Sequence, residues 1–361
     1  MKPLSRRSVL RAAGLGSLGA GLASSLPLHV GAATAESGHA AAAERAAPQG
    51  HAAAPSTHAA QHDLGVVGSY DKELFDPGRY LRAWNFNDLP AAERARFYRE
   101  SPRADGSLLR EYEFFAVDRE IEIAPGVYFP AWTYNGQVPG PTIRATQGDL
   151  IRIRFVNQGS HPHTLHFHGW HPPAMDGSHP DQQVEPGGEF LYEFAADPFG
   201  LHLYHCHALP LKRHIHKGLY GAFIVDPPAA TPRPPADELV MLMNAFDTNF
   251  DGDNEVYAVN TAAHFHMSEP VRVELGKLVR IYLVNVTEFD LINSFHLHGM
   301  FFKVFRTGTS LESHEITDNL MLCQGERAIV ETTFRYPGQH MFHAHQSEFA
   351  ELGWMGLFEA G

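Results

Sequence analysis

The chain has 361 residues, of which 44% are hydrophobic, so it is long enough for two domains with apolar cores. Its two cysteines cannot form a disulfide framework, and a formal net charge of −13 argues against nucleic acid as a partner. The 24 histidines are a strong bias, and they point to metal ligation or proton chemistry.

The N-terminus has the features of an export signal. Arg6 and Arg7 precede an apolar run rich in Gly, Ala and Leu, and an A-x-A cleavage site ends at Ala35. The arginine pair resembles the twin-arginine type of signal, which predicts a periplasmic or secreted protein. The apolar run is too short and too rich in glycine to span a membrane. We therefore expect residues 1–35 to be removed, with no membrane span afterwards.

The next segment is poor in large apolar side chains. Residues 36–62 are mostly Ala, His, Pro and Ser, and such a composition buries too little surface to order itself. We expect a flexible low-complexity segment there, followed by an N-terminal extension over residues 63–109. Within the extension, "LPAAERARFYRE" is the clearest helical pattern.

The rest of the chain predicts an all-β fold with an internal duplication. Short alternating runs bounded by Gly, Pro and Asn are typical of strands and turns. The run "GDLIRIRFVN" at residues 148–157 returns as "GKLVRIYLVN" at residues 276–285. A proline-rich stretch separates the two copies. These features predict Greek-key β-barrel or sandwich domains over residues 110–226 and 239–361, joined by a linker over 227–238.

Histidines recur at alternate positions in both halves. Each half carries two H-x-H units at matching places, namely His166 and His168, His205 and His207, His296 and His298, and His343 and His345. Residues i and i+2 of a strand point to the same face, so each unit offers two imidazoles to one side. Four units placed symmetrically predict a metal cluster shared by the two halves.

Cys206 stands between His205 and His207 and favours copper over zinc. A thiolate with two imidazoles and a weak axial neighbour is the blue-copper arrangement, which serves electron transfer. The candidate partners of the thiolate are His163 and His214. Two residues past His214, His216 is its rival for that role.

Two further observations bear on this blue-copper assignment: the residue at the axial position, and the residues that occupy the matching positions of the second half. Leu219 lies five residues after His214, where an axial methionine would stand, and a copper left three-coordinate favours Cu(I) and a raised potential. The second half has no copy of the three proposed ligands, because Asn293, Ala344 and Phe349 occupy their positions. Loss of all three together, while every H-x-H unit remains, indicates two separate sites.

The motifs "YNGQVPGPTIRATQGD", "HTLHFHG", "YHCH", "FHLHG" and "FHAH" together resemble those of the multicopper oxidases. The resemblance spans residues 110–361. With two cupredoxin domains and the blue copper in the first, the chain resembles a two-domain laccase-like oxidase.

The resemblance implies four copper ions per chain. It assigns the type 1 copper to His163, Cys206 and His214, and the type 2 copper to His166 and His296. The type 3 pair would be bound by His168, His205, His207, His298, His343 and His345. It also implies a homotrimer, with the trinuclear cluster between the first domain of one subunit and the second domain of the next.

The implied reaction couples one-electron oxidation of a donor, such as a phenol or a metal ion, to four-electron reduction of O2 to water. Electrons would pass along the Cys206 backbone to the flanking histidines. Asp176, Glu348 and Glu351 are candidates for proton delivery, with an ordinary solvated carboxylate as the alternative for each.

Two other functions stay open. A copper nitrite reductase shares the two-domain trimer and the first-domain blue copper, but it carries an aspartate where this chain has His166 and needs only three histidines for its catalytic copper. Eight paired histidines therefore favour oxygen chemistry. A non-catalytic copper or electron-transfer protein would leave the second-half histidines without a purpose.

Three further signals are interpreted as structural. "HFHM" at residues 264–267 is expected to be an ordinary loop. "DTNFDGDNE" at residues 247–255 begins like a calcium loop but lacks its final glutamate, so a hairpin turn is expected. Cys323 lies in an apolar run and is expected to be a buried small hydrophobe.

Overall fold

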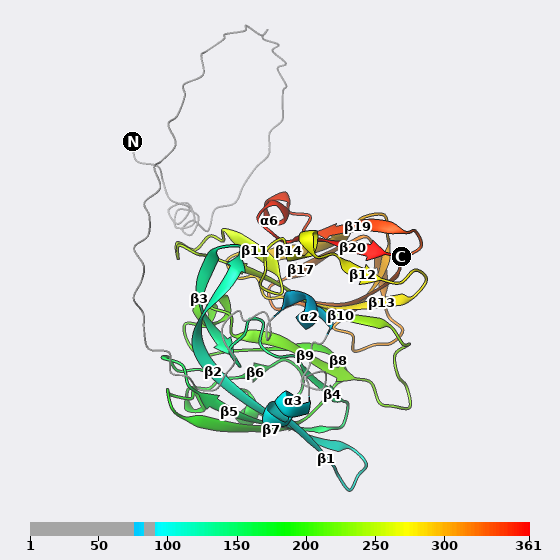
Figure 1. The fold of residues 1–361 in the computed structure, drawn as a ribbon. Coiled ribbons are helices and arrows are strands. Elements are labelled where there is room, and N and C mark those ends of the chain that lie inside the picture. The colour runs from blue at the N-terminus through cyan, green and yellow to red at the C-terminus, as the bar shows by residue number, and fades with distance from the viewer. Residues whose placement is uncertain (1–75, 83–90) are drawn as a thin grey trace, which may run out of the picture. The chain divides into compact units, whose positions relative to one another are not determined.

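The computed structural model describes residues 76–82 and 91–361. The expected export signal and low-complexity segment lie outside the described residues, as does most of the extension before residue 91. Most of the regular structure is β-sheet, which confirms the all-β prediction (Figure 1). None of the described helices is long and apolar enough to cross a membrane.

Residues 98–226 form two sheets. One has the order β1-β2-β5-β7, with β3 also pairing with β2, and the other has the order β4-β9-β8-β6. The strands of the first sheet are β1 (Tyr98–Pro102), β2 (Leu108–Ala124), β3 (Val127–Tyr134), β5 (Leu150–Asn157) and β7 (Glu189–Ala195). Those of the second are β4 (Ile143–Thr146), β6 (His166–Phe167), β8 (Gly200–His205) and β9 (Tyr220–Asp226).

Residues 237–360 form two further sheets, ordered β11-β10-β13-β18-β15-β16 and β12-β20-β19-β14-β17. The first comprises β10 (Asp237–Phe246), β11 (Val256–Val259), β13 (Leu278–Asn285), β15 (Phe302–Arg306), β16 (Glu315–Thr317) and β18 (Arg327–Thr333). The second comprises β12 (Val271–Val273), β14 (Ile292–Leu297), β17 (Asn319–Cys323), β19 (Gly338–His343) and β20 (Met355–Ala360).

The two copies of the sequence repeat form strands that pair with their neighbours in the same way. The repeated strands β5 and β13 each pair in parallel with an earlier strand, β2 and β10, and antiparallel with a later one, β7 and β18. Their inward side chains fill the cores of their respective halves.

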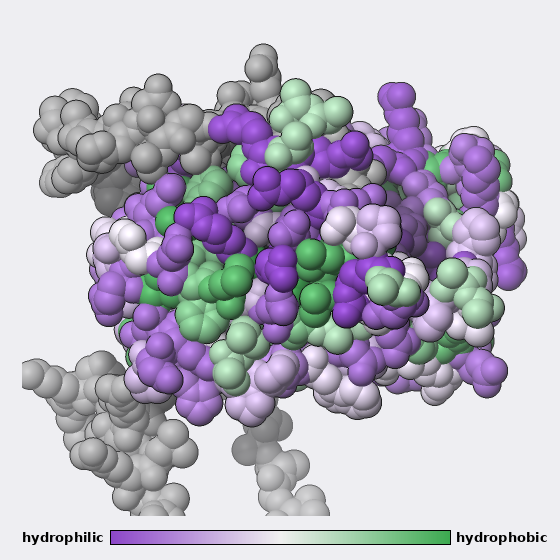
Figure 2. Space-filling model, turned by 90° about the horizontal axis from the view of Figure 1, so that it is seen from below, coloured by the Kyte–Doolittle hydropathy of each residue, from purple (hydrophilic) through white to green (hydrophobic). Residues whose placement is uncertain are grey.

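Helices are short and connect or cover the sheets. They are α2 (Pro77–Arg82), α3 (Ala91–Phe97), α4 (Leu211–His216), α5 (Phe265–Ser268) and α6 (Ser347–Glu351), with 3-10 turns at Pro173–Met175 and Pro180–Gln182. The helical pattern around residue 91 thus forms α3, and the chain enters β1 directly after it. On the face shown in Figure 2, polar side chains predominate and apolar ones form separate patches.

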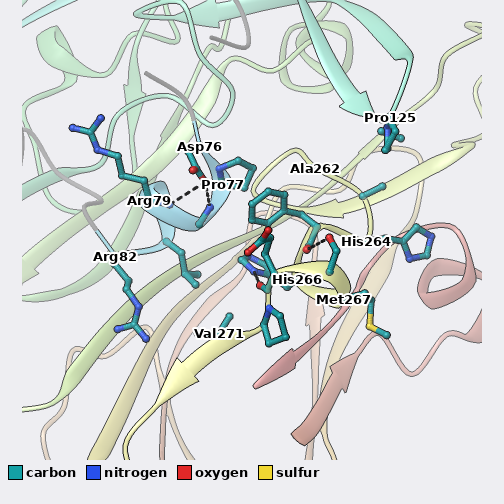
Figure 3. Close-up of a pocket in the computed structure, with 18 of the residues that line it drawn as sticks. Asp76, Pro77, Arg79, Arg82, Pro125, Ala262, His264, His266, Met267 and Val271 are labelled. Atoms are coloured by element: carbon teal, nitrogen blue, oxygen red, sulfur yellow. Dashed lines mark hydrogen bonds between the residues drawn. The ribbon is translucent and has the colours of Figure 1, made fainter. Parts of the chain in front are cut away.

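Two structural expectations were wrong in detail. "HFHM" forms the single turn of α5 rather than a loop, beside a hollow of about 940 Å³ (Figure 3). His264 precedes the helix in a left-handed backbone conformation, and its ring points in a different direction from that of His266. Cys323 is exposed, because the edge strand β17 alternates and turns Cys323 outward with Met321. The hairpin over residues 247–255 is confirmed, since β10 and β11 pair antiparallel on either side of it.

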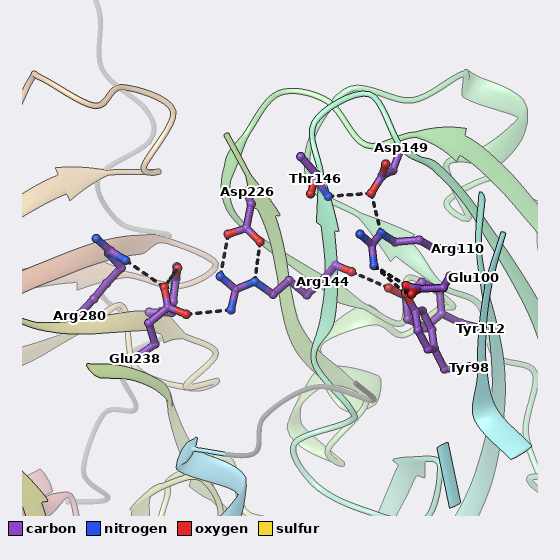
Figure 4. Close-up of polar contacts among 11 residues, drawn as sticks. Tyr98, Glu100, Arg110, Tyr112, Arg144, Thr146, Asp149, Asp226, Glu238 and Arg280 are labelled. Atoms are coloured by element: carbon purple, nitrogen blue, oxygen red, sulfur yellow. Dashed lines mark hydrogen bonds and ion pairs between the residues drawn. The ribbon is translucent and has the colours of Figure 1, made fainter. Parts of the chain in front are cut away.

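The two halves are joined by a chain of ion pairs (Figure 4). Arg144 on β4 pairs with Asp226 at 2.6 Å and with Glu238 at 2.8 Å. Glu238, at the start of β10, also accepts hydrogen bonds from Arg280 at 2.9 Å and from the Tyr282 hydroxyl at 2.8 Å. The Arg280 side chain is only 2% exposed. Because Glu238 contacts cations from both halves, it fixes their junction.

Replacing Glu238 with glutamine should lower the free energy of unfolding by about 2 kcal/mol, because the buried Arg280 guanidinium loses one of its two carboxylate partners and keeps Glu331. Chemical denaturation of the purified protein measures this loss. The matched control is Glu189→Gln, which removes a surface pair with Arg154 and should cost less than about 1 kcal/mol. Equal losses for both variants would contradict the proposed role of Glu238.

Candidate metal centres

A thiol and two imidazoles converge in the core of the first half. The Sγ atom of Cys206 lies 3.2 Å from Nδ1 of His214 and 3.9 Å from Nδ1 of His163. The two Nδ1 atoms are 3.2 Å apart, and all three side chains are buried. Three metal-ligating atoms thus surround one point that is closed to solvent.

Different elements bring these three residues together. Cys206 follows the end of β8, and its N–H donates to the carbonyl of Leu219, which precedes β9. His163 is held by reciprocal backbone hydrogen bonds with Val184, and His214 lies in α4. Leu219, the expected axial residue, is fully buried.

His216 does not join this group. It follows His214 on α4 but points away, and its Nε2 accepts a hydrogen bond of 2.9 Å from the N–H of Asp247. Its ring packs edge-on against Phe129 and Phe289, with centroids 5.4 and 4.8 Å away. Of the two rivals, the structure therefore brings His214 to the thiol.

A second group lies at the end of the β6–β8 pair. His166 and His205 are cross-strand partners, which sets their rings 5.0 Å apart. His168 joins them, with its Nε2 atom 3.3 Å from that of His205. The ring of His207 lies 5.1 Å from that of His166. All four first-half imidazoles of the H-x-H units therefore gather in one place.

The second half repeats this arrangement at the β14–β19 pair. His296 and His343 are cross-strand partners, and Nε2 of His343 lies 2.9 Å from Nε2 of His298. The ring of His345 lies 5.3 Å from that of His296. Among the described residues, the histidines of the two halves form separate metal-ligating groups within one chain.

Backbone carbonyls orient four of these imidazoles. A carbonyl only accepts, so the facing Nδ1 carries the proton and Nε2 keeps its lone pair for a metal. His166 and His296 each donate over 2.7 Å, and His205 and His343 over 2.9 and 2.6 Å. The acceptors are, in that order, Asp176, Asp318, Cys206 and Ala344. The two halves thus orient histidines at matching positions by the same hydrogen bond from Nδ1 to a backbone carbonyl.

Comparison with known proteins agrees with this geometry. Residues 117–230 and residues 231–361 match two family models, both described as multicopper oxidase. The chain belongs to the multicopper oxidase family. Members of this family are copper oxidoreductases, so copper is the cofactor that the family implies.

Relatives of this multicopper oxidase include proteins of different named activity. A structure titled "Crystal structure of multicopper oxidase" is 52% identical, with a TM-score of 0.74 over 79% of this chain and 97% of that chain. The copper-containing nitrite reductase of Neisseria gonorrhoeae is 28% identical over 63% of this chain and 62% of its own length. The L-ascorbate oxidase of Cucurbita maxima is 36% identical over 36% of this chain and 23% of its own length. The chain thus spans less than two thirds of either curated relative.

The donor set of this multicopper oxidase fits copper. Burial lowers the pKa of His163 to about 3 and that of His214 to about 4, so both imidazoles are neutral and can donate a lone pair. Burial raises the pKa of the Cys206 thiol, so a nearby cation is needed to form the thiolate. The N–H of Thr164 lies 3.4 Å from Sγ and is placed to stabilise that charge.

Asp176 lies beside the second group and has partners that the sequence did not indicate. Its carboxylate contacts Nε2 of His171 at 2.8 Å, accepts a hydrogen bond from Ser178, and lies 3.4 Å from Nδ1 of His166. Burial opposes ionisation of Asp176, but the bonds from Ser178 and His171 lower its pKa to about 2. His171 and Ser178 lie with Asp176 in the "HPPAMDGS" stretch. Their spacing follows no regular period, so the sequence alone does not indicate that they contact Asp176. Glu348 lies on the exposed side of α6, as does Glu351.

The copper-free protein should lose stability as the pH falls from about 6.5 to about 4. Unfolded histidines titrate near 6.5, whereas burial lowers the pKa of His216 to about 4, so the unfolded chain binds more protons in this window. The variant His216→Gln removes one such group. It should be less stable at pH 7.5 and show a shallower loss on acidification.

Urea unfolding of the copper-free protein and of its His216→Gln variant at pH 7.5, 6.0 and 5.0 measures how steeply the free energy of unfolding of each falls with pH. The exposed His314→Gln variant is the matched control. If the free energy of unfolding of His216→Gln falls with pH as steeply as that of the unchanged protein, His216 does not contribute to the acid sensitivity.

Proposed function

We propose that this protein is a laccase-like oxidase that couples one-electron oxidation of a small donor to four-electron reduction of O2 to water. The observation that carries the proposal is the imidazole of His166. It joins three other first-half imidazoles, and His296 is its counterpart in the second half, with the same carbonyl contact. A carboxylate at this position would favour nitrite as the substrate instead.

The proposed ligand sets divide the histidines by location. His163, Cys206 and His214 would bind the type 1 copper, with Leu219 in the axial position. His166 and His296 would bind the type 2 copper, and the type 3 pair would be held by His168, His205, His207, His298, His343 and His345. When bound, copper supplies the redox chemistry: the thiolate-ligated ion accepts single electrons, and the three-ion cluster passes four of them to O2.

The protein's own residues connect and supply these sites. Cys206 is covalently linked to His205 and His207, so one short stretch of backbone joins the two groups. The hydrogen bond from His205 Nδ1 to the carbonyl of Cys206 adds a second connection within that stretch. Asp176 is the proposed proton-delivery residue, because its carboxylate lies at the second group and is held there by His171 and Ser178.

We also propose the homotrimer. Each half of one chain offers four imidazoles in its own group, so an eight-histidine cluster needs the first half of one chain and the second half of another. Large apolar side chains flank the second-half group: Leu291 before β14 is 82% exposed and Phe301 after His298 is 67% exposed. A second copy of the chain would cover them. Export by the twin-arginine route, to the periplasm or medium, remains part of the proposal.

Copper analysis of the purified protein should give four ions per chain, because the eight paired histidines would bind three ions and Cys206, with its two histidines, would bind the fourth. Oxygen consumption with a phenolic donor should be rapid, and nitric oxide release from nitrite under reducing conditions should be absent. Two ions per chain together with nitric oxide release would refute the oxidase and support a copper nitrite reductase, which is the activity named for the Neisseria relative.

Replacing Cys206 with serine should abolish the intense blue absorption, because that colour requires the thiolate ligand. Copper content should fall from four ions per chain to about three, since the histidine groups are untouched. The control is Cys323→Ser, which alters the exposed second thiol and should keep the colour. A blue Cys206→Ser protein would overturn the type 1 assignment.

A further inference from the structure

The helix that carries His214 has an unusual charge. In a chain with 41 acidic and 28 basic residues, α4 and the residue after it contain Lys212, Arg213 and Lys217 and no acidic side chain. Among the described residues, none of these three cations forms an ion pair. Lys212 and Arg213 are exposed, whereas Lys217 is buried.

Each of the three cations lies over an aromatic ring. Nζ of Lys212 is 4.0 Å from the centre of the Phe289 ring, and Cζ of Arg213 is 5.2 Å from that of Trp132. Nζ of Lys217 is 4.9 Å from the Phe129 ring. Such contacts fix the position of a cation without neutralising its charge. The exposed charges of Lys212 and Arg213 therefore remain available to an incoming anion, whereas Lys217 is buried and burial lowers its pKa to about 8.

Trp132 connects this positive surface to the thiol site. Its ring lies 4.8 Å from that of His214 and 5.3 Å from that of His163. The ring of the partly exposed His161 also lies against Trp132, with centroids 4.4 Å apart and the planes tilted by 39°. Arg213 lies over the Trp132 ring, and that ring is in contact with His214, so a molecule bound at Arg213 is close to the thiol site.

Three carboxylates act on α4 and the residue after it, namely those of Glu288, Asp118 and Asp247. Glu288 acts on Lys212, but burial raises the pKa of Glu288 to about 7, so it is only partly ionised at neutral pH. Asp118 acts on Lys217 and Asp247 acts on His216, and both of these α4-side groups are buried. The exposed positive charge of this helix is therefore that of Lys212 and Arg213, although the chain as a whole is acidic.

We propose that Arg213 and Lys212 form the docking site for an anionic one-electron donor beside Trp132. The proposal rests on the oxidase function above, because O2 takes up the electrons. The donor loses one electron and becomes less negative by one unit, no bond is made or broken, and the electron passes to the thiol site next to His214. Opposite charge would raise the local concentration of anionic donors at this point of the surface.

The first test compares donors of different charge. Removing one charge at contact distance should lower kcat/KM for ferrocyanide, relative to that for the neutral 2,6-dimethoxyphenol, by about 5-fold in Arg213→Gln. The loss should grow in the Lys212→Gln, Arg213→Gln double variant and shrink with added salt. Arg213→Lys keeps the charge and should restore most of the preference. Lys303→Gln, which removes an exposed cation on β15, is the matched control.

The second test does not depend on turnover. Hexacyanocobaltate(III) is a redox-inert anion, and calorimetry should show it binding to the copper-free protein about 5-fold more weakly after Arg213→Gln. Blue absorption of the copper-loaded variant should be unchanged, which excludes a distorted thiol site. No binding of hexacyanocobaltate, or equal losses with ferrocyanide and the phenol, would overturn the docking site. If the anion binds through Arg213 but no donor supports oxygen consumption, the oxidase function fails and the anion site stands.

Discussion

Neighbouring side chains on an extended chain point to opposite sides, and the two metal-ligating groups of the first half depend on this constraint. At residues 205–207 the cysteine points into the core toward His163 and His214, while the histidines on either side of it point to the group at the end of β6. This three-residue stretch therefore supplies ligating atoms to both groups. The cross-strand pairing of His166 with His205 then sets the position of the second group.

The thiol group also relies on the second half of the chain. The helix α4 is short, and its position is held by residues outside its own sheets. The backbone N–H of Asp247 donates to His216, and Phe289 packs between His216 and Lys212. Both come from loops that leave strands of the second half. Together with the ion pairs around Glu238, these contacts explain how the second half helps to shape the site formed by Cys206, His163 and His214.

Burial gives the ligands their chemical character. Neutral imidazoles in an apolar core cost less to bury than a thiolate, which needs a compensating cation there. The raised pKa of Cys206 and the lowered pKa values of its partners therefore describe a site that is prepared for a metal and poorly suited to holding a free charge. The exposed imidazole of His298 in the second half contrasts with these buried ligands.

Periodicity and duplication in the sequence were enough to predict the all-β fold, the pairing of imidazoles and the separation of Cys206 from its flanking histidines, because these follow from local geometry and strand alternation. The choice of His214 over His216 needed the tertiary structure, since both lie on one short helix and only packing against Asp247 and Phe289 decides which ring reaches the thiol. Packing likewise decided the exposure of Cys323, which an apolar run could not reveal because β17 is an edge strand. The partners of Asp176 and the aromatic rings beneath the α4 cations are contacts between residues with no shared period, so only the folded chain brings them together.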